Sequence, residues 1–320
     1  MSTYKIIKKL FLPVGLVLAV ILSFCVPRFG IAFKSALNQN ILIMLIFLIC
    51  GFQTTLNELR ITKRSLIFLV GGALLTLFVC PLFAWGITLL LGLAALPAAG
   101  LIVVAAAPPT LSSGIVMTET AGGNNVTAVA ITMLYNIVAV FTIPLVLGLA
   151  LASETGINTD PLNMLKKLFL LVVIPFIIGF DLKNLFRMKK APSWFSFVSS
   201  TAVILLILFF FSASSDSMKK ISGIMLFKGF AAAIVLHLGS LAAFWYGGKA
   251  LKLPEEECKA YLFTAASKTL TMALTTLAIM GAESGDAVAP CIIFYFFQMM
   301  FDSSLAAKMG LSAKEPSGNA

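Results

Sequence analysis

Charged and titratable side chains are scarce in this sequence. Asp, Glu, Lys and Arg make up 11% of the 320 residues, less than half of the roughly 25% found in globular proteins. Only one histidine is present, so the H-E-x-x-H zinc site cannot form. The five cysteines lack C-x-x-C spacing, and we interpret all of them as packing residues. These shortages exclude a disordered chain, a secreted protein and a water-soluble enzyme.

Apolar residues are abundant instead. They form 60% of the chain, with 27 phenylalanines, and mean hydropathy is +1.03. A helix needs about 20 apolar residues to cross a roughly 30 Å hydrocarbon core. Reading the runs between charge clusters therefore predicts an all-α polytopic membrane protein with ten spans. They cover approximately residues 10–26, 40–57, 65–92, 96–121, 124–152, 164–186, 193–213, 224–248, 258–281 and 286–309.

The net charge is +10, and the positions of the basic residues along the chain indicate the membrane topology. We expect no nucleic-acid partner. With the N-terminus in the cytoplasm, fifteen basic residues fall on the inner side and seven on the outer side. The positive-inside rule then places both termini in the cytoplasm, and we expect an inner (plasma) membrane location. The fifteen are Lys5, Lys8, Lys9, Arg60, Lys63, Arg64, Lys183, Arg187, Lys189, Lys190, Lys249, Lys252, Lys259, Lys308 and Lys314.

The ten spans divide into two sets of five at the polar linker 153–163. The first repeat covers residues 1–152, the second 164–309, and 310–320 form a cytoplasmic tail. Because each repeat has an odd number of spans, the two repeats have opposite orientations in the membrane. This arrangement is the inverted repeat that is common in transporters.

The fourth span of each repeat is interrupted. The first break lies near 108–113, at Pro108 and Pro109, and the second near 267–270. Each interrupted span ends in a glycine-rich polar turn, at 122–125 and 281–286. Matched breaks in matched positions predict a transporter binding site.

The doubled proline predicts unwound backbone at membrane depth. Two residues without a backbone N–H remove two helix hydrogen bonds, and such backbone persists only inside protein or a water-filled cavity. Ser112 and Ser113 then begin a new half-helix, whose free N–H groups favour an anionic ligand. The alternative is a proline kink in which the serine hydroxyls bond back to the chain.

Lys268 falls in the middle of the second interrupted span. An unpaired ammonium there costs on the order of 2.5–3.5 kcal/mol on insertion scales. We expect it to replace a coupling cation, to bind a substrate carboxylate or to exchange a proton, the alternative being a structural lysine satisfied by carbonyls of the broken helices. Its neighbours Ser267, Thr269 and Thr271 complete this candidate segment.

Other polar residues lie deep in the spans. Thr132 and Asn136 are four residues apart and share one helix face. The only histidine, His237, is predicted to be a hydrogen-bonded core residue, with a proton relay as the alternative. Glu119 and Asp302 lie near span ends, and Asp302 is expected at the membrane interface.

These features together resemble the bile acid:sodium symporter family. The match rests on Ala-Pro-Pro-Thr-Leu-Ser-Ser-Gly-Ile-Val-Met-Thr (107–118), the following Gly-Gly-Asn (122–124) and the interrupted ninth span, and it covers residues 10–309. The segment 266–272 is more similar to the divergent SBF-like branch. The resemblance implies a four-helix panel domain and a six-helix core domain, with two sodium sites where the interrupted helices cross.

Carried over by motif, Ser113, Thr132 and Thr271 correspond to residues of those sodium sites. The family's asparagine after the serine is Gly114 here, its ninth-helix glutamate is replaced by Ser267 and its glutamine by Thr271. A third-helix glutamine is also replaced, near Thr76. The strongest oxygen ligands of sodium are therefore missing, and Lys268 lies beside the lost glutamate.

The sequence thus predicts a secondary transporter of a small organic anion or related metabolite, with sodium coupling weakened or absent. Sodium or a proton is the expected coupling ion, and no other cofactor is expected. The alternatives are a sodium-coupled symporter of bile-acid type, or a membrane sensor or enzyme without transport. The candidate site consists of Pro108, Pro109, Ser112, Ser113, Thr132, Asn136, Ser267, Lys268, Thr269 and Thr271.

Overall fold

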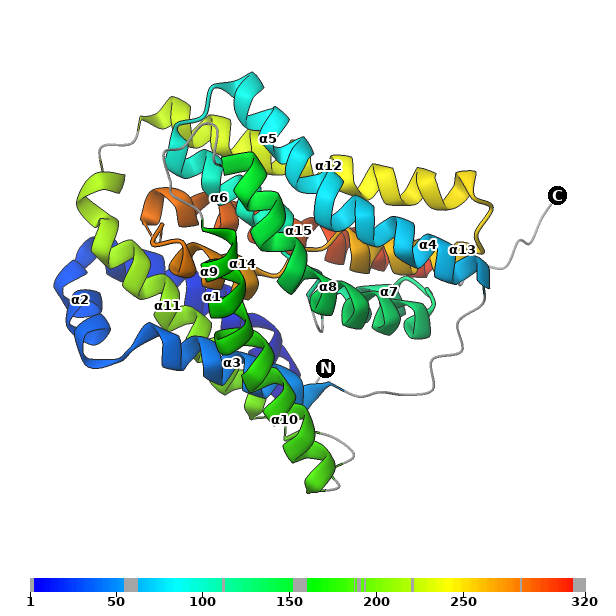
Figure 1. The fold of residues 1–320 in the computed structure, drawn as a ribbon, viewed down its shortest axis with the longest axis horizontal. Coiled ribbons are helices and arrows are strands. Elements are labelled where there is room, and N and C mark those ends of the chain that lie inside the picture. Colours follow the sequence, from blue (N-terminus) through cyan, green and yellow to red (C-terminus); the bar gives the residue numbers. More distant parts are fainter. Residues whose placement is uncertain are drawn as a thin grey trace.

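The structure is a computed structural model, and the part of the chain that it describes contains helices and no strands. The helices are long and run side by side in layers (Figure 1). This confirms the predicted all-helical class. The described residues are 3–54, 63–110, 113–151, 160–186, 188, 191–192, 194–219, 222–282 and 284–312.

The helices of the first half fall at the predicted apolar runs, except α2, which lies between the first two runs. They are α1 (Thr3–Cys25), α2 (Pro27–Ala36), α3 (Gln39–Gln53), α4 (Lys63–Leu74), the π-helical turn η1 (Leu75–Val79), α5 (Cys80–Leu91), α6 (Ala95–Ala106), α7 (Ser113–Thr120) and α8 (Asn125–Leu151).

The second half follows the same pattern of apolar runs. Its helices are α9 (Pro161–Leu168), the π-turn η2 (Phe169–Val173), α10 (Ile174–Leu185), α11 (Phe195–Met218), α12 (Gly223–Ala250), α13 (Glu255–Ala260), the π-turn η3 (Tyr261–Ala265), α14 (Leu270–Ile279) and α15 (Gly285–Ser312).

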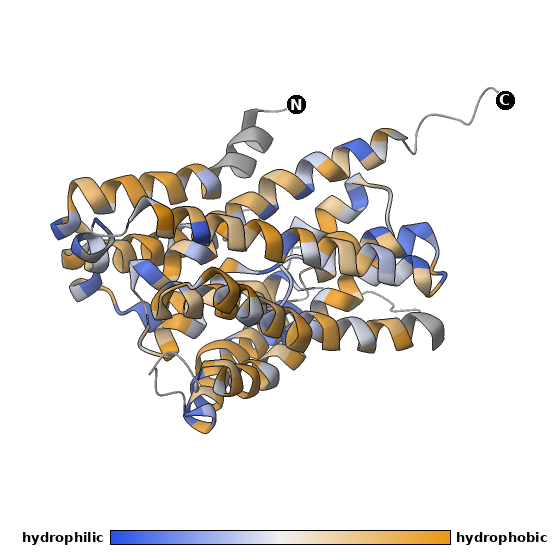
Figure 2. Ribbon diagram, turned by 90° about the horizontal axis from the view of Figure 1, so that it is seen from above, coloured by the Kyte–Doolittle hydropathy of each residue, from blue (hydrophilic) through white to orange (hydrophobic). Residues whose placement is uncertain are grey.

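Seven continuous helical segments in the described part are long and apolar enough to cross a membrane, or eight when α1 and α2, bent by 107°, count as one span. Hydrophobic residues cover most of the helix lengths, with hydrophilic residues gathered largely toward helix ends and turns (Figure 2). Helices α3 and α6 are apolar but shorter. The chain is thus an integral membrane protein, and the ten-span inverted repeat stays a prediction.

The helices pack in two groups (Figure 1). In one, α3 lies along α10, and α11 contacts α1, α2 and α3. In the other, α15 contacts α6 and α12, and both of these contact α5. The groups meet where α11 packs against α15 and where α8 packs against α9.

Glycines allow the closest helix crossings. A side chain at Gly51 of α3 would collide with the carbonyl oxygen of Phe176 in α10, and one at Gly179 with that of Leu48. Gly100 of α6 lies equally close to the carbonyl oxygen of Ala287 in α15. Small residues at helix interfaces let backbones approach each other in this way, which increases packing contacts in a membrane.

The two predicted interruptions are present as breaks in the helices. Helix α6 ends at Ala106 and α7 begins at Ser113, and η3 ends at Ala265 before α14 begins at Leu270. The half-helices that follow the breaks both end at a left-handed glycine, Gly122 (φ +70°) and Gly281 (φ +67°). Glycine adopts this conformation without steric cost and so terminates helices.

Only three of the five cysteines are buried as the packing interpretation requires. Cys80, Cys258 and Cys291 are buried and Cys50 is half-buried. Cys25 is exposed, so its interpretation as a packing residue is wrong. It is the last residue of α1, at the sharp bend into α2, where fewer neighbouring helices cover the side chain.

Candidate functional site

The two interrupted segments meet. The N–H of Thr269 donates a hydrogen bond to the carbonyl of Pro108 (2.9 Å), and the N–H of Thr110 donates to the hydroxyl of Ser267 (3.4 Å). Segments separated by about half the chain therefore satisfy part of each other's unwound backbone. This is how non-helical backbone persists at membrane depth.

A cluster of hydroxyls surrounds the start of α7. Thr110 Oγ1 lies 2.6 Å from Ser113 Oγ and accepts a hydrogen bond from the N–H of Gly114 (3.2 Å), so it caps the half-helix. Thr118 Oγ1 lies 3.2 Å from Thr264 Oγ1 of η3. The sequence analysis missed Thr110 as a member of this site, although it follows the doubled proline directly. Ser112, a predicted site residue, lies outside the described residues.

Gly114 explains one departure from the bile acid:sodium symporter pattern. A Cβ at this position would lie 3.0 Å from the carbonyl oxygen of Phe263 and 3.1 Å from the Cα of Thr264. The start of α7 therefore packs directly on the backbone of η3. A larger side chain such as asparagine would require α7 and η3 to move apart by a few tenths of an ångström.

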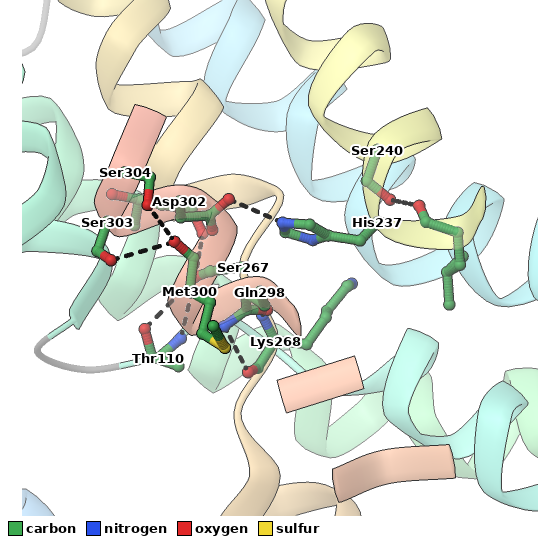
Figure 3. Close-up of polar contacts among 12 residues, drawn as sticks. Thr110, His237, Ser240, Ser267, Lys268, Gln298, Met300, Asp302, Ser303 and Ser304 are labelled. Carbon is green, nitrogen blue, oxygen red and sulfur yellow. Dashed lines mark hydrogen bonds and ion pairs between the residues drawn. The ribbon is translucent and has the colours of Figure 1, made fainter. Parts of the chain in front are cut away.

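The peptide of Lys268 is held by Gln298 of α15. The N–H of Lys268 donates to Gln298 Oε1 (2.7 Å), and Gln298 Nε2 donates to the carbonyl of Lys268 (3.3 Å). Gln298 is buried, with 1% of its surface exposed. Figure 3 shows Gln298 beside Lys268 and Ser267. The sequence analysis gave Gln298 no role, and the only available signal was an amide within an apolar span.

The ammonium of Lys268 binds a main-chain carbonyl on a different span. Its Nζ donates to the carbonyl of Thr76 in η1 (2.9 Å), and 1% of the residue is exposed. The π-turn makes that carbonyl available. The N–H of Cys80 bonds to the carbonyl of Leu75, and Pro81, the next candidate donor along the chain, has no N–H.

Thr76 also binds the second interrupted segment through its side chain, because its hydroxyl donates to the carbonyl of Ala265 (3.0 Å). In the described part of the chain, no carboxylate forms an ion pair with Lys268. The sequence alternative is a lysine satisfied by carbonyls of the broken helices. The acceptor found in the structure belongs to η1, so that alternative is wrong about the partner of the ammonium. Within the part of the chain that the structure describes, the Lys268 ammonium group contacts a carbonyl and no carboxylate.

Asn136 and Thr132 of α8 lie against the first break in different ways. The amide of Asn136 donates to the carbonyls of Pro109 (3.1 Å) and Thr132 (2.7 Å). The hydroxyl of Thr132 donates to the carbonyl of Ala128 (2.9 Å), one turn back in its own helix. Among the residues described, no hydrogen bond joins Ser113, Thr132 and Thr271, so the sodium remnant predicted from these three stays a prediction.

Asp302 is not at the interface, and that expectation is wrong. It is fully buried, and its Oδ1 lies 2.8 Å from Nε2 of His237 on α12, which is also fully buried. Helix α15 continues to Ser312, so ten residues, or about 15 Å of helix, follow Asp302. His237 is the hydrogen-bonded core histidine that the sequence predicts, and Glu119 is exposed.

These features define a class of protein. Two interrupted apolar helices cross inside a membrane bundle, and an ammonium, hydroxyls and an amide gather at the crossing, which is the architecture of secondary transporters. Within the residues that the structure describes, no three His, Cys, Asp or Glu side chains form a metal site.

Sequence comparison identifies the family. The chain belongs to the SBF-like CPA transporter family, which matches residues 11–310. This confirms the resemblance to bile acid:sodium symporters and the divergent branch. The family and the relatives named below are transporters and not enzymes.

Three relatives show the breadth of the similarity. The chain is 26% identical to the probable sodium/metabolite cotransporter BASS4, chloroplastic, of Arabidopsis thaliana, over 92% of this chain and 71% of the relative. It is 24% identical to sodium/bile acid cotransporter 7 of Danio rerio, over 93% of both chains. It is 29% identical to the uncharacterized protein YbaS of Bacillus subtilis, over 72% of this chain and 73% of that protein.

Proposed function

We propose that this chain is a secondary active transporter of a small organic anion or related metabolite, in which the ammonium of Lys268 takes the place of a coupling sodium ion. The observation that carries this proposal is the bond from Lys268 Nζ to the Thr76 carbonyl (2.9 Å) beside the crossing of the interrupted segments. Sodium coupling is then weakened or absent, and transport is driven by protons or is facilitated.

The chemistry of the crossing supports this substitution. A lysine ammonium and a sodium ion carry the same charge, and both are satisfied by carbonyl oxygens. The positions at which the resemblance leads us to expect sodium ligands hold Gly114, Ser267 and Thr271, so carboxylate and amide oxygens have been lost while a permanent cation has been gained. The lost carboxylate and the gained ammonium both shift the charge of the crossing in the positive direction, which favours an anionic substrate.

An anionic substrate is supported by the start of α7. The hydroxyls of Thr110 and Ser113 lie there together with the N-terminal end of the half-helix, where the helix dipole is positive. The Lys268 ammonium adds a full positive charge close to the same crossing. Two relatives carry names that specify sodium/metabolite and sodium/bile acid cotransport, which favours a small metabolite as the substrate class.

The two packing groups suggest the moving parts. In this proposal α1, α2, α3, α9, α10 and α11 form the panel domain and the other helices the core domain, which holds both interrupted segments. Rocking of one against the other at the α11–α15 and α8–α9 contacts exposes the crossing alternately to the two sides. The ten spans and both termini in the cytoplasm of an inner membrane belong to the same proposal.

Uptake by proteoliposomes tests the function. Purified protein is reconstituted, and entry of labelled taurocholate, succinate and pyruvate is measured under a sodium gradient and under a matched potassium gradient. We expect at least one of these anions to enter equally fast under both gradients. We expect Lys268→Ala to abolish that entry, because the substitution removes the positive charge from the crossing and leaves a cavity in place of the side chain. Ser212→Ala on α11 should not change the entry of the anion.

A sodium-coupled symporter is the second candidate, and the sodium in the relatives' names favours it. Strong dependence of uptake on the sodium gradient in the parent protein would overturn the proposed role of Lys268 and support this candidate. Anion binding detected by thermal shift without any flux would instead indicate a membrane sensor.

A further inference from the structure

A buried pair of ionisable side chains lies one helical turn away from the crossing. His237 of α12 and Asp302 of α15 are both 0% exposed, and their Nε2 and Oδ1 atoms are 2.8 Å apart. The rings of Phe294 and Phe297 stand edge-on to the imidazole, with centroids at 5.3 and 5.8 Å. In the described part of the protein, His237 Nδ1 and Asp302 Oδ2 have no hydrogen-bond partner.

Charge counting shows what this arrangement favours. A neutral imidazole that donates its Nε2 proton to a carboxylate leaves the pair with one negative charge in apolar surroundings. One added proton, on Nδ1 or on Oδ2, makes the pair neutral overall. Because a net charge is costly inside low-dielectric surroundings and a neutral pair is not, the closed pair favours the bound proton. Contact with water removes that preference.

Other titratable groups on the surrounding elements could also balance the charge of the pair. Helices α6 and α14 carry no titratable side chain, α11 carries only Asp216, which is exposed, and the acid on α7 is Glu119, also exposed. The remaining titratable groups on elements packed against α12 and α15, or on these helices themselves, are Cys80, Glu255, Glu256, Glu257, Cys258, Lys259, Tyr261, Lys268, Lys228, Tyr246, Lys249, Asp286, Cys291, Tyr295 and Lys308.

Among the described residues, none of these groups forms an ion pair with His237 or Asp302, and Lys259 is already paired with Glu255 (2.9 Å). The ammonium of Lys268 binds the carbonyl of Thr76 and is therefore not paired with Asp302. The pair must therefore balance its own charge, and a proton is the cation that it is built to take.

Two helices lead from the pair toward the crossing, and Figure 3 shows Asp302, Gln298 and Lys268 along the first of them. On α15, Asp302 follows Gln298 by one turn, and Gln298 holds the peptide of Lys268. On α12, Ser240 follows His237 by almost one turn and lies 3.5 Å from the sulfur of Cys80. Cys80 directly follows η1, which holds the ammonium of Lys268.

We propose that His237 and Asp302 form a proton-binding site that holds one proton while α12 and α15 are closed around it and releases the proton when water reaches it. As a coupling site this rests on the proposed transport function, but proton binding itself requires neither substrate nor flux. The site differs from the Lys268 crossing in its residues and in its ligand, which is a proton.

The single histidine makes the test direct. The full chain, purified through an affinity tag that contains no histidine, is labelled with ¹⁵N-histidine and placed in lipid nanodiscs. The two ring nitrogens of His237 are followed by NMR from pH 5 to 9, with the infrared band of a protonated carboxylic acid recorded in parallel. We expect one protonation step in at least one of these signals. A ring and a carboxyl that stay unchanged throughout overturn the proposal.

Two variants separate the pair from its surroundings. Asp302→Asn removes the negative partner, so a proton bound there would leave a net positive charge in the buried site, and the protonation step is expected to disappear or to move to lower pH. Ser212→Ala, an equally buried change on α11, is expected to leave the step in place, and size-exclusion chromatography monitors folding of both variants. An unshifted step in Asp302→Asn contradicts the proposal, because the histidine then titrates without its partner.

Failure of this inference and failure of the proposed function have different signatures. Sodium-independent uptake together with a His237 ring and a carboxyl band that both stay unchanged overturns the proton site alone. A titrating pair in a protein without any flux supports the proton site and overturns the transport function.

Discussion

Lys268 is distinguished by the kind of partner that it has. A buried lysine next to a carboxylate forms a neutral pair, but the side chain of Lys268 here donates to the carbonyl of Thr76. A carbonyl provides only a partial negative charge, so a charged Lys268 leaves the site with the net charge of one bound monovalent cation. An anion entering the crossing would supply the missing negative charge.

At this scale we predict that Lys268→Gln creates sensitivity to sodium. The substitution removes the charge but supplies an amide oxygen near the Thr76 carbonyl. We expect sodium chloride to raise the Tm of the variant above its value in potassium chloride, by a stabilisation of about 1.4 kcal/mol at ten times the Kd. The parent should show equal Tm values in the two salts. A sodium-specific rise in the parent would contradict the cation-replacement role of Lys268.

At the scale of the helices, single prolines and glycines change how the backbone forms hydrogen bonds and how closely two helices pack. Pro81 leaves the carbonyl of Thr76 without its π-turn donor, and Gly100 lets α6 approach the backbone of α15. Both residues act through what they lack, a backbone N–H in one case and a side chain in the other. Each thereby determines how another element can bind or pack.

We predict that Pro81 and Lys268 are energetically coupled. Pro81→Ala supplies an N–H that competes for the Thr76 carbonyl, so Lys268 loses part of its bond. In a double-mutant cycle with Lys268→Met, the effects on unfolding free energy should be non-additive by about 0.5–3 kcal/mol. Pro175→Ala, which changes the corresponding proline after η2, should be additive with Lys268→Met. Additive effects at Pro81 would show that the π-turn does not control the lysine.

We predict that Gly100→Ala destabilises the protein by about 1–3 kcal/mol, because its Cβ would meet the carbonyl oxygen of Ala287 and force α6 away from α15. Gly86→Ala in α5 is the matched control, because no atom lies within 4 Å of its added Cβ. That change should be neutral or slightly stabilising. Thermal unfolding in detergent measures both, and equal Tm values for the two variants would contradict this account of the crossing.

The molecule as a whole raises the question of how many times the chain crosses the membrane. Seven segments, or eight with the bent pair, satisfy length and composition. The inverted repeat requires ten, in which α3 and the α6–α7 pair also cross. Short spans are compatible with this arrangement where the bilayer is locally thinned or where flanking residues extend to the membrane surface.

One position separates the two topologies. With ten spans, the basic segment around Arg60 lies in the cytoplasm, whereas with eight spans, counted from a cytoplasmic N-terminus, α3 does not cross and the segment lies outside. We predict that a reporter fused after residue 58 gives a cytoplasmic signal, with green fluorescence and no alkaline phosphatase activity. A fusion within 153–159 is the control, because both topologies place it outside. Phosphatase activity at residue 58 would rule out the ten-span arrangement.

The sequence alone determined the membrane location, the helical class and the positions of both breaks. Each of these depends on local chemistry: the length of apolar runs, the missing N–H groups of Pro108 and Pro109, and glycines that end helices. The family resemblance followed from the same motifs, because the interrupted helices carry its most specific residues.

Only the tertiary structure decided which polar groups meet. Lys268 finds its acceptor at Thr76, 192 residues away, and Asp302 finds His237 on another helix. Helices that are apolar on nearly every side carry little periodic signal of which face turns inward, so sequence spacing could not rank these pairings. Burial favours a partner for a lone polar group, and which partner is within reach depends on how the helices cross.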